Sequence, residues 1–251
     1  MEDELKNLLV KIDSLKKILD SARPLINESI LNAVDIEYTY DSNRIEGNTL
    51  TLRETDIVIN KGLTIGGKSM REHLEANNHY EAILYIRDLI KHDTKISESL
   101  IKSIHSIVLQ GIDRENGGKY RTLPVAISGS RYIPPQPWQV PKMMEDMILW
   151  IEDKSDSLHP AVLSAQIHEQ IATIHPFIDG NGRTARLVMN LVLLQNGYPI
   201  SNIPSDTKNR VAYYNALEKC NINSDKSDFL LLIASYVHQS LEKILKILGK
   251  S

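Results

Sequence analysis

The sequence has only one cysteine, Cys220, among its 251 residues. An intrachain disulfide is therefore excluded, and a reducing cytoplasm suits the chain. Long apolar runs are absent too, because the most apolar stretch near the end, residues 229–237, is far shorter than the ~20 residues of a membrane-spanning helix. The acidic start Met1-Glu2-Asp3-Glu4 lacks the basic and apolar parts of a secretory signal. We expect a soluble, intracellular protein.

An excess of either charge is missing as well. The chain has 29 Lys and Arg against 32 Asp and Glu, which gives a formal net charge of −3. This balance argues against a broad basic surface for nucleic acid or for an anionic membrane. The length suits one large domain, or a core with a helical extension, and we find no repeat, low-complexity segment or long linker.

Most of the chain has apolar residues at helical spacing, which predicts an all-α fold. The first stripe runs from Leu5 to Leu19, and Arg23-Pro24 interrupts it. We expect this stripe to pack onto the core; a seam between two copies is the less favoured alternative. Further helices are predicted over residues 24–45, 51–60, 69–91, 97–110, 140–152, 160–174, 184–195, 206–220 and 227–248.

Several histidines lie on these predicted helices. For His73, His79 and His105, roles in the core or on the surface outweigh chemistry. His168-Glu169 precedes His175, but the spacing differs from His-Glu-x-x-His, and no cysteine or third histidine follows at a suitable distance. A catalytic zinc site is therefore not expected.

One stretch of the sequence has a different pattern. Residues 125–133 alternate β-branched residues around a Ser128-Gly129-Ser130 turn, and Pro134-Pro135 ends them. Such alternation predicts the one β-hairpin of the chain. A hairpin that only packs against the core is the plain alternative. We favour a functional hairpin because the rest of the chain is so helical.

The residues from His175 to Arg186 hold most of the chemistry that the sequence offers. Helical segments flank them, so they form a loop and the first turn of a helix. Backbone N–H groups at a helix start are unpaired and carry partial positive charge, so Gly180-Asn181-Gly182 can wrap an anion. Arg183 and Arg186 share a helix face and can reach one polyphosphate.

Two further residues of this block add reactivity. Asp179 supplies the anionic oxygen that Mg²⁺ prefers beside phosphate oxygens and water. His175 is the nearby group suited to proton transfer at neutral pH. Each residue alone is more often structural, but their gathering in one short block indicates a nucleotide-phosphate site with its own base.

The block matches, without a substitution, the Fic-family signature His-Pro-Phe-x-(Asp/Glu)-Gly-Asn-Gly-Arg-x-x-Arg, and weaker similarity extends from about Asp35 to about Asn221. On these residues the chain resembles the Fic family. The resemblance implies an all-helical core that transfers AMP from ATP, with Mg²⁺, to a hydroxyl side chain of a target protein. Relatives similar to the toxin Doc transfer the terminal phosphate and have lysine in place of Gly182, so glycine here favours AMP transfer.

The resemblance also implies a role for each residue of the block. His175 is the base that deprotonates the acceptor hydroxyl, Asp179 holds Mg²⁺, and the two arginines stabilise the departing pyrophosphate. Tyrosines of the 206–220 helix line the adenine pocket, and because the two are adjacent we expect only one to contact adenine. The implied nucleotide-binding residues are Gly180, Asn181, Gly182, Arg183, Thr184, Ala185, Arg186, Tyr213, Tyr214 and Asn221.

A second family pattern, (Ser/Thr)-x-x-x-Glu-(Gly/Asn), matches Ser42, Glu46 and Gly47. By resemblance this is an inhibitory segment, about 35–47, that precedes the catalytic signature. A carboxylate of Glu46 paired with Arg186 would occupy the guanidinium that otherwise holds the γ-phosphate. ATP would then bind in an orientation unsuited to attack.

The hairpin region, about 120–135, corresponds by resemblance to the flap beside the active site. Its exposed edge would hold the target segment by main-chain pairing, with Gly129, Ser130, Arg131 and Tyr132 as the contacts. The expected organisation is a helical extension over 1–34, a Fic core over 35–221 and a C-terminal helix over 222–251 that packs on the core.

We therefore expect a protein adenylyltransferase that its own Glu46 inhibits and that also modifies itself. Three alternatives stay open: removal of AMP by hydrolysis with Glu46 orienting a water, transfer of another group such as phosphate or phosphocholine, and a nucleotide-sensing regulatory module. The intact His175 and Asp179 argue against the last. A homodimer is compatible with the sequence, whereas nucleic-acid and membrane partners are not expected.

Overall fold

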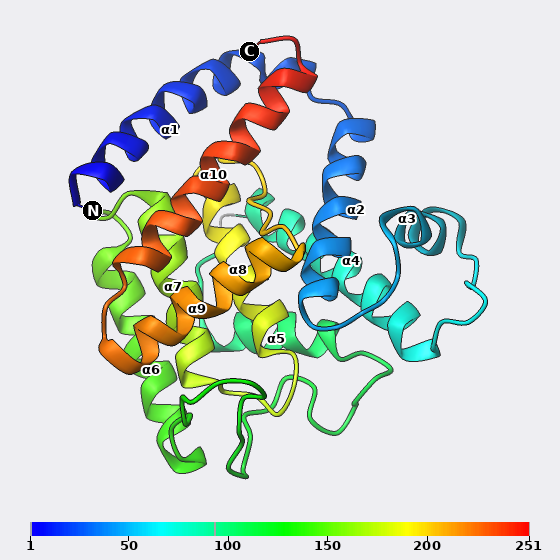
Figure 1. Ribbon diagram of the computed structural model, residues 1–251, viewed down its shortest axis with the longest axis vertical. Coiled ribbons are helices and arrows are strands. Elements are labelled where there is room, and N and C mark those ends of the chain that lie inside the picture. The colour runs from blue at the N-terminus through cyan, green and yellow to red at the C-terminus, as the bar shows by residue number, and fades with distance from the viewer. Residues whose placement is uncertain (1, 93, 251) are drawn as a thin grey trace.

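A computed structural model of the chain describes residues 2–92 and 94–250 and confirms the predicted all-α class (Figure 1). Within these ranges there are helices and turns but no strand. Two short 3-10 helices, η1 (Arg23–Leu25) and η2 (Pro137–Gln139), accompany the α-helices. These are α1 (Glu2–Ala22), α2 (Glu28–Ile45), α3 (Leu52–Lys61), α4 (Met70–Lys91), α5 (Glu98–Val108), α6 (Val140–Lys154), α7 (Pro160–Ile174), α8 (Asn181–Gln195), α9 (Thr207–Asn223) and α10 (Ser227–Ile247).

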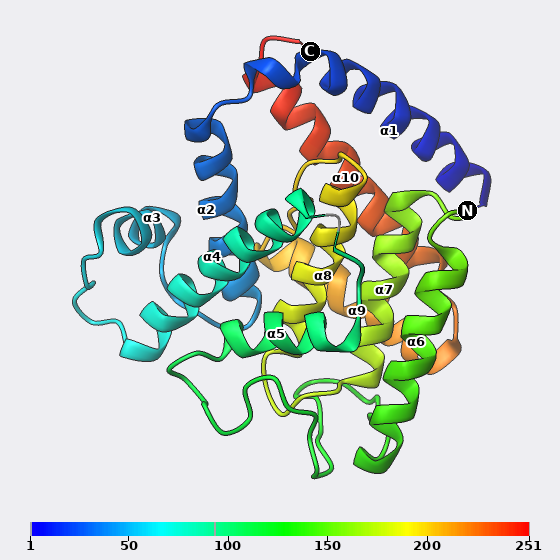
Figure 2. The same cartoon turned by 180° about the vertical axis from the view of Figure 1, so that it is seen from behind.

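Helix α8 lies at the centre of the molecule, with the other helices around it (Figures 1 and 2). Its side chains join two apolar clusters. Leu187 and Leu191 belong to a cluster with α4 to α7, whereas Met189 and Leu193 belong to one with α1, α9 and α10. Burial of apolar side chains on both sides fixes this helix, so its first turn is a rigid base for a site.

The N-terminal stripe packs onto the core, as predicted. Ile12 and Leu19 are fully buried in the cluster that includes α10, and Figure 1 shows α1 lying beside that helix. A hydrogen bond from the Tyr198 hydroxyl to Asp13, 3.1 Å long, also ties α1 to the segment after α8. The alternative, a seam between two copies, stays a prediction.

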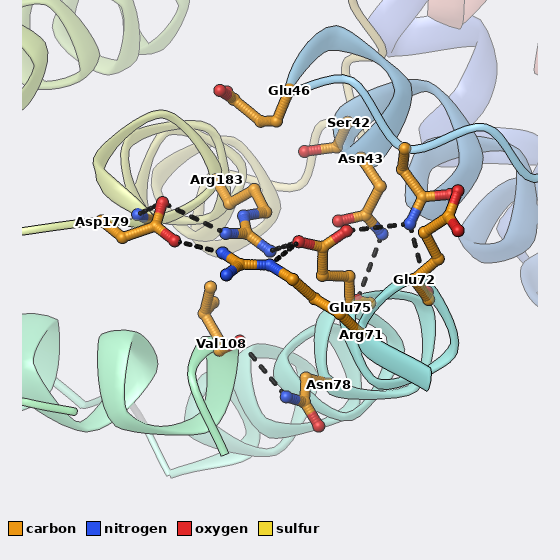
Figure 3. A network of polar contacts seen from close by, with 12 residues as sticks. Ser42, Asn43, Glu46, Arg71, Glu72, Glu75, Asn78, Val108, Asp179 and Arg183 are labelled. Atoms are coloured by element: carbon orange, nitrogen blue, oxygen red, sulfur yellow. Dashed lines mark hydrogen bonds and ion pairs between the residues drawn. The ribbon is translucent and has the colours of Figure 1, made fainter. Parts of the chain in front are cut away.

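Helix α4 begins directly after Ser69, the residue at which the sequence predicted a helix to start. Ser69 accepts a hydrogen bond from the Glu72 backbone N–H, and the Glu72 carboxylate accepts one from the Ser69 N–H at 2.8 Å, which completes a capping box. This start fixes the register of the helix, so that Arg71 and Glu75 project toward the start of α8 (Figure 3).

The predicted β-hairpin does not form as paired strands. Residues 120–135, which we call the flap loop, are extended chain with a turn at which the Ser130 N–H donates to the Ile127 carbonyl at 3.1 Å. Pro124 and the pair Pro134-Pro135 remove backbone donors, and a side chain rather than a partner strand satisfies carbonyl groups of this loop. The alternating pattern correctly predicted that this chain is extended. The prediction that it pairs with itself as two strands is wrong.

No helix of the described ranges is both long and apolar enough to span a bilayer. The expected division at residues 34 and 221 stays a prediction. Met1, Asp93 and Ser251, which that division includes, lie outside the described residues.

Candidate active site

The block from His175 to Arg186 forms a sharp bend between α7 and α8. His175 ends α7 in the left-handed region, with φ 49° and ψ 58°, and its N–H donates to the Ile171 carbonyl at 2.9 Å. The Asn181 side chain then bonds both the N–H and the carbonyl of Phe177, each at 2.9 Å. Gly180, at φ 76°, permits the turn into α8.

The His175 imidazole is held as a neutral base. Its Nδ1 lies 3.3 Å from the Ala172 carbonyl, which can only accept, so Nδ1 carries the proton and the Nε2 lone pair is left to receive another. Burial lowers the pKa of His175, and the Arg121 charge acts in the same direction. The Ala172 hydrogen bond and the carboxylates of Glu46 and Asp179 oppose this shift without reversing it.

The start of α8 offers unpaired backbone donors. The N–H groups of residues 181–183 have no acceptor within the helix, and Gly180 contributes no side-chain cap. The Asn181 side chain is occupied by Phe177, so only its backbone can face an anion. The Thr184 N–H bonds the Gly180 carbonyl. Thr184 and Ala185 are both fully buried, so neither adds a side-chain contact at the surface.

Arg183 is a buried cation with incomplete pairing. Its Nη1 lies 3.6 Å from a Glu75 oxygen and its Nη2 lies 3.6 Å from an Asp179 oxygen, both beyond hydrogen-bonding distance. Within the described part of the chain, its Nε and Nη1 have no hydrogen-bond partner. A buried guanidinium with spare donors suits phosphate oxygens.

Arg186, in contrast, is fully engaged. Its Nε donates to the Ser42 hydroxyl at 2.9 Å, its Nη2 to the Ser42 carbonyl and to Glu46, each at 2.8 Å, and its Nη1 to the Tyr213 hydroxyl at 3.3 Å. Burial alone would lower the pKa of Arg186, but the Glu46 carboxylate and the tyrosine hydroxyls raise it overall. The Glu46–Arg186 pair predicted from the sequence is therefore present.

Gly182 packs directly against this ion pair. A Cβ at this position would overlap the Glu46 carboxylate and approach the Arg186 guanidinium to 3.1 Å. The contact concerns space rather than backbone freedom, and a larger residue here would push the end of the Glu46 side chain away. The Glu46 side chain thus lies over the first turn of α8, where an anion would bind.

Asp179 is paired with an arginine that the sequence analysis missed. Arg71 of α4 donates to it at 2.6 Å, and Figure 3 shows the Asp179 carboxylate between Arg71 and Arg183. Burial would raise the pKa of Asp179, but Arg183, the Gly180 N–H and Arg71 lower it overall, so the group is ionised. The sequence signal that could have pointed to Arg71 was its i, i+4 spacing from Glu75, directly after a capping box.

A magnesium ion fits Asp179 if phosphate completes its coordination. The carboxylate is ionised and 44% exposed, and a single carboxylate beside phosphate oxygens and water is a common Mg²⁺ environment. The described ranges contain no group of three or more His, Cys, Asp or Glu that could hold a metal ion by themselves. Arg71 would have to leave Asp179 to admit the cation.

Glu75 links the end of α2 with the catalytic bend. One of its oxygens accepts from Arg71 at 3.1 Å and faces Arg183, and the other accepts from Asn48 at 2.9 Å. Its backbone carbonyl accepts from Asn43 on α2 at 3.2 Å (Figure 3). The end of α2 and the loop that holds Asp179 therefore both contact α4 at Arg71 and Glu75.

The predicted adenine residues are placed differently from one another. Tyr213 is buried, accepts from Arg186 and donates to His168 Nε2 at 3.0 Å. Tyr214 is 44% exposed, and its hydroxyl donates to the Ile45 carbonyl at 3.0 Å, at the end of α2. Asn221 accepts a hydrogen bond from Thr173 of α7. Only Tyr214 of the two tyrosines has a face open to a ligand.

His105 supports the bend through hydrogen bonds and ring stacking, in agreement with the structural role predicted for it. Its Nε2 donates to the Asp179 carbonyl at 2.9 Å, its Nδ1 accepts from the Gly118 N–H at 2.9 Å, and its ring stacks on Phe177 with centroids 3.6 Å apart. Burial lowers the pKa of His105 to about 4, so it stays neutral.

The four flap residues named from the sequence lie at the turn of the flap loop and directly after it. Gly129 takes φ 77° at its turn, and the Arg131 N–H donates to Glu218 of α9 at 2.9 Å. The Ser130 hydroxyl accepts from the Tyr132 N–H, and the Tyr132 hydroxyl donates to the Thr173 carbonyl at 3.2 Å. The loop is thus tied to α7 and α9 rather than paired with itself.

Comparison with known proteins agrees with this geometry. A model of the Fic/DOC family matches residues 95–193, which include the whole bend. Protein adenylyltransferase Fic of Drosophila persimilis is 34% identical over 242 residues, which cover 96% of this chain and 46% of that protein. The chain belongs to the Fic/DOC family.

Solved Fic structures share the whole architecture. Fic-1 (residues 134–508) of Caenorhabditis elegans superposes with a TM-score of 0.86 at 29% identity, over 98% of this chain and 73% of that one. A Fic-domain signaling protein of Bacteroides thetaiotaomicron gives 0.80 at 28% identity, over 99% and 98%. This Fic chain spans less than half of the curated Drosophila relative, so activity and partners are taken up below as proposals.

Proposed function

We propose that this Fic protein transfers AMP from ATP to a hydroxyl side chain of a target protein. The observation that carries the proposal is the neutral His175 imidazole held beside the unpaired N–H groups of α8 and the incompletely paired Arg183. A curated relative at 34% identity is named protein adenylyltransferase, which supports the same reaction.

The reaction follows from what these residues can hold. The N–H groups of residues 181–183 and the Arg183 guanidinium bind phosphate oxygens, while His175 Nε2 takes the proton of the acceptor hydroxyl. The oxygen then attacks the α-phosphorus, and the arginines stabilise charge on the leaving pyrophosphate. When bound, Mg²⁺ would neutralise phosphate charge, with Asp179 as its protein ligand.

We further propose that Glu46 inhibits this reaction. Arg186 uses four of its five N–H donors on Ser42, Glu46 and Tyr213, so it has no pair of donors left for a γ-phosphate. The Glu46 carboxylate also lies against Gly182, where the triphosphate would cross the start of α8. ATP must displace this carboxylate to bind in the productive orientation.

Comparison of Glu46→Gly with the wild type tests both proposals. Loss of a charge-assisted hydrogen bond, worth ~1.5–3 kcal/mol, should raise AMP transfer about 10- to 100-fold. Intact mass and labelled ATP report the transfer, including that to the protein itself. Glu46→Gln is the matched control, because it keeps the size of the side chain and should give a smaller gain.

His175→Ala in the Glu46→Gly background separates the two roles. It should abolish labelling and leave ATP binding measurable, because the base contributes roughly two to four orders of magnitude in rate. Undiminished labelling by this variant would refute the base, whereas equal labelling by wild type and Glu46→Gly would refute only the inhibition. A product with the mass of phosphate or phosphocholine would replace AMP transfer with another transfer.

We propose that the flap loop presents the target, and that the protein itself is one such target. Residues 129–132 stand at the turn of this loop. The N–H groups of Ser130, Arg131 and Tyr132 are already bonded within the protein, so an incoming segment would pair with the carbonyl groups of this turn. We also propose a cytoplasmic location, because a single cysteine suits a reducing compartment. Cell fractionation tests this location.

The reverse reaction, removal of AMP from a modified protein, has one observation in its favour. The Glu46 carboxylate reaches the first turn of α8 and acts on the His175 imidazole, so it could orient a water toward the same phosphorus. Release of AMP from a labelled target by wild type, and not by Glu46→Gly, would favour this direction.

A further inference from the structure

Arg121, the second residue of the flap loop, is a buried cation whose acceptors are backbone carbonyl groups. Its Nε donates to the carbonyl of His175 at 2.8 Å, its Nη1 to Leu123 at 3.2 Å and its Nη2 to Pro135. The residue is only 3% exposed, and within the described ranges no carboxylate forms an ion pair with it. Burying an unpaired charge is costly, which points to a specific role.

The contacts of Arg121 join two parts of the molecule that are far apart in the sequence. Its own N–H donates to the Pro176 carbonyl at 2.9 Å, so it fixes two successive carbonyl groups of the catalytic bend. Leu123 and Pro135 lie at opposite ends of the flap loop, so the same guanidinium also closes the neck of that loop.

His175 needs such a support because its backbone conformation is unfavourable. The left-handed region is unfavourable for a non-glycine residue, which persists there only where its surroundings hold it. Ile171 holds the His175 N–H, Ala172 faces its Nδ1, and Arg121 holds its carbonyl. Of these three, Arg121 is the one that does not belong to α7.

The Arg121 charge also acts on the imidazole. Burial is the main cause of the lowered pKa of His175, and Arg121 is the nearby cation that lowers it further. Glu46 from the end of α2 and Asp179 from the bend face the imidazole and act in the opposite direction. Removing the Arg121 charge leaves burial as the main opponent of these two anions, so the pKa of His175 should rise.

We propose that Arg121 is a positioning residue that fixes the general base and the neck of the flap loop as one unit. A hydroxyl held by the flap then meets His175 Nε2 at a constant distance, whatever the sequence around it. This role rests on the proposed transfer of AMP and deepens it. Arg121 itself touches neither nucleotide nor target.

The test uses Arg121→Lys and Arg121→Met in the full chain with Glu46→Gly. Lysine keeps the charge without the planar fork of donors, whereas methionine removes both. Arg114→Met is the matched control, because Arg114 is exposed on the segment that leads into the flap loop. AMP transfer, its pH profile and ATP affinity are measured for each variant, with thermal melting to confirm folding.

We expect Arg121→Met to lower transfer about 100-fold, as misplacement of a reacting group does, with ATP affinity changed by less than about twofold. The acidic limb of its pH profile of AMP transfer should move to higher pH. Arg121→Lys should lose about tenfold while its acidic limb stays near that of the parent protein. Arg114→Met should leave all three quantities unchanged.

Histidine side-chain NMR gives a readout that does not depend on turnover. The His175 signal is assigned by its loss in His175→Ala, and its pKa should rise in Arg121→Met but not in Arg121→Lys. If AMP transfer is absent from every variant, the proposed function fails while this measurement still stands. The role of Arg121 would be overturned if folded Arg121→Met kept the His175 pKa of the parent protein or its full rate of transfer. If Arg121→Met does not fold, full transfer by Arg121→Lys would overturn the role instead.

Discussion

At the scale of single residues, the two arginines of the signature differ in what they already bind. Arg186 has Glu46, Ser42 and Tyr213 as partners, whereas Arg183 keeps donors without a partner among the described residues. The same residue type, three positions apart on one helix, therefore serves two purposes. Arg183 is ready for phosphate, and Arg186 becomes available only when Glu46 leaves.

The depressed pKa of His175 predicts the acidic limb of the pH profile. Transfer needs the neutral imidazole, and burial keeps it neutral at pH values where a free imidazole, with pKa ~6.5, is half protonated. The midpoint of the acidic limb for Glu46→Gly should therefore lie below pH 6.5. Removal of the Glu46 charge, which favours protonation, adds to this effect.

The quantity to measure is kcat/KM for ATP between pH 5 and pH 8. A midpoint at or above 6.5 would mean that His175 is solvated in the working enzyme, contrary to its burial here. Melting curves over the same range separate titration of the base from acid unfolding.

At the scale of elements, contacts with three other helices hold the end of α2. Glu46 pairs with α8, and the Tyr214 hydroxyl of α9 donates to the last carbonyl of α2, that of Ile45. Glu75 of α4 supports the same helix end through Asn43 and Asn48. Release of the end of α2, which we propose to be inhibitory, would thus require several contacts to break together.

Tyr214→Phe should weaken this hold without removing the exposed ring that we propose to face the nucleotide. One neutral hydrogen bond is worth ~1 kcal/mol, so basal AMP transfer should rise by up to about fivefold. In the Glu46→Gly background the same change should add nothing, because the pair it helps to hold is already lost. Tyr236→Phe, which removes another hydrogen-bonded hydroxyl on α10, is the control for transfer.

An equal gain from Tyr214→Phe in both backgrounds would show that the hydroxyl acts on nucleotide binding and not on α2. No gain in either background would show that the end of α2 is held without it.

The sequence predicted the helices better than the contacts between them. Start signals at Ser97, Pro160 and Asp206 place helices correctly, because capping and apolar spacing are local. The Glu46–Arg186 pair came from a family pattern. Arg71 and Arg121 were missed because their partners lie more than fifty positions away, and nothing local marks which carbonyl or carboxylate they meet.

At the scale of the whole molecule, three buried histidines lie around α8. Burial lowers the pKa of His168 to about 3 and that of His105 to about 4, and it lowers the pKa of His79 well below 6.5. An unfolded chain binds protons at these sites below pH ~6.5, whereas the folded chain does not. Their contribution to stability is therefore fully present above pH 6.5 and is lost as pH falls toward 4 and 3.

The melting temperature should accordingly fall steadily from pH 6.5 to 4.5, measured by scanning calorimetry. His168→Gln should give a shallower slope, because one of the three sites no longer takes up a proton on unfolding. His92→Gln, at a position whose side chain is 70% exposed, should keep the slope of the wild type. Identical slopes for all three proteins would contradict the assignment.

The contact between Gly182 and Glu46 constrains how this chain could diversify. Any side chain at position 182, including the lysine of Doc-like relatives, would need the volume that the Glu46 carboxylate fills. A lysine at this position would therefore move the Glu46 carboxylate and weaken the proposed inhibition. The two traits compete for the same space beside Arg186, so we expect them to exclude one another among descendants of this chain.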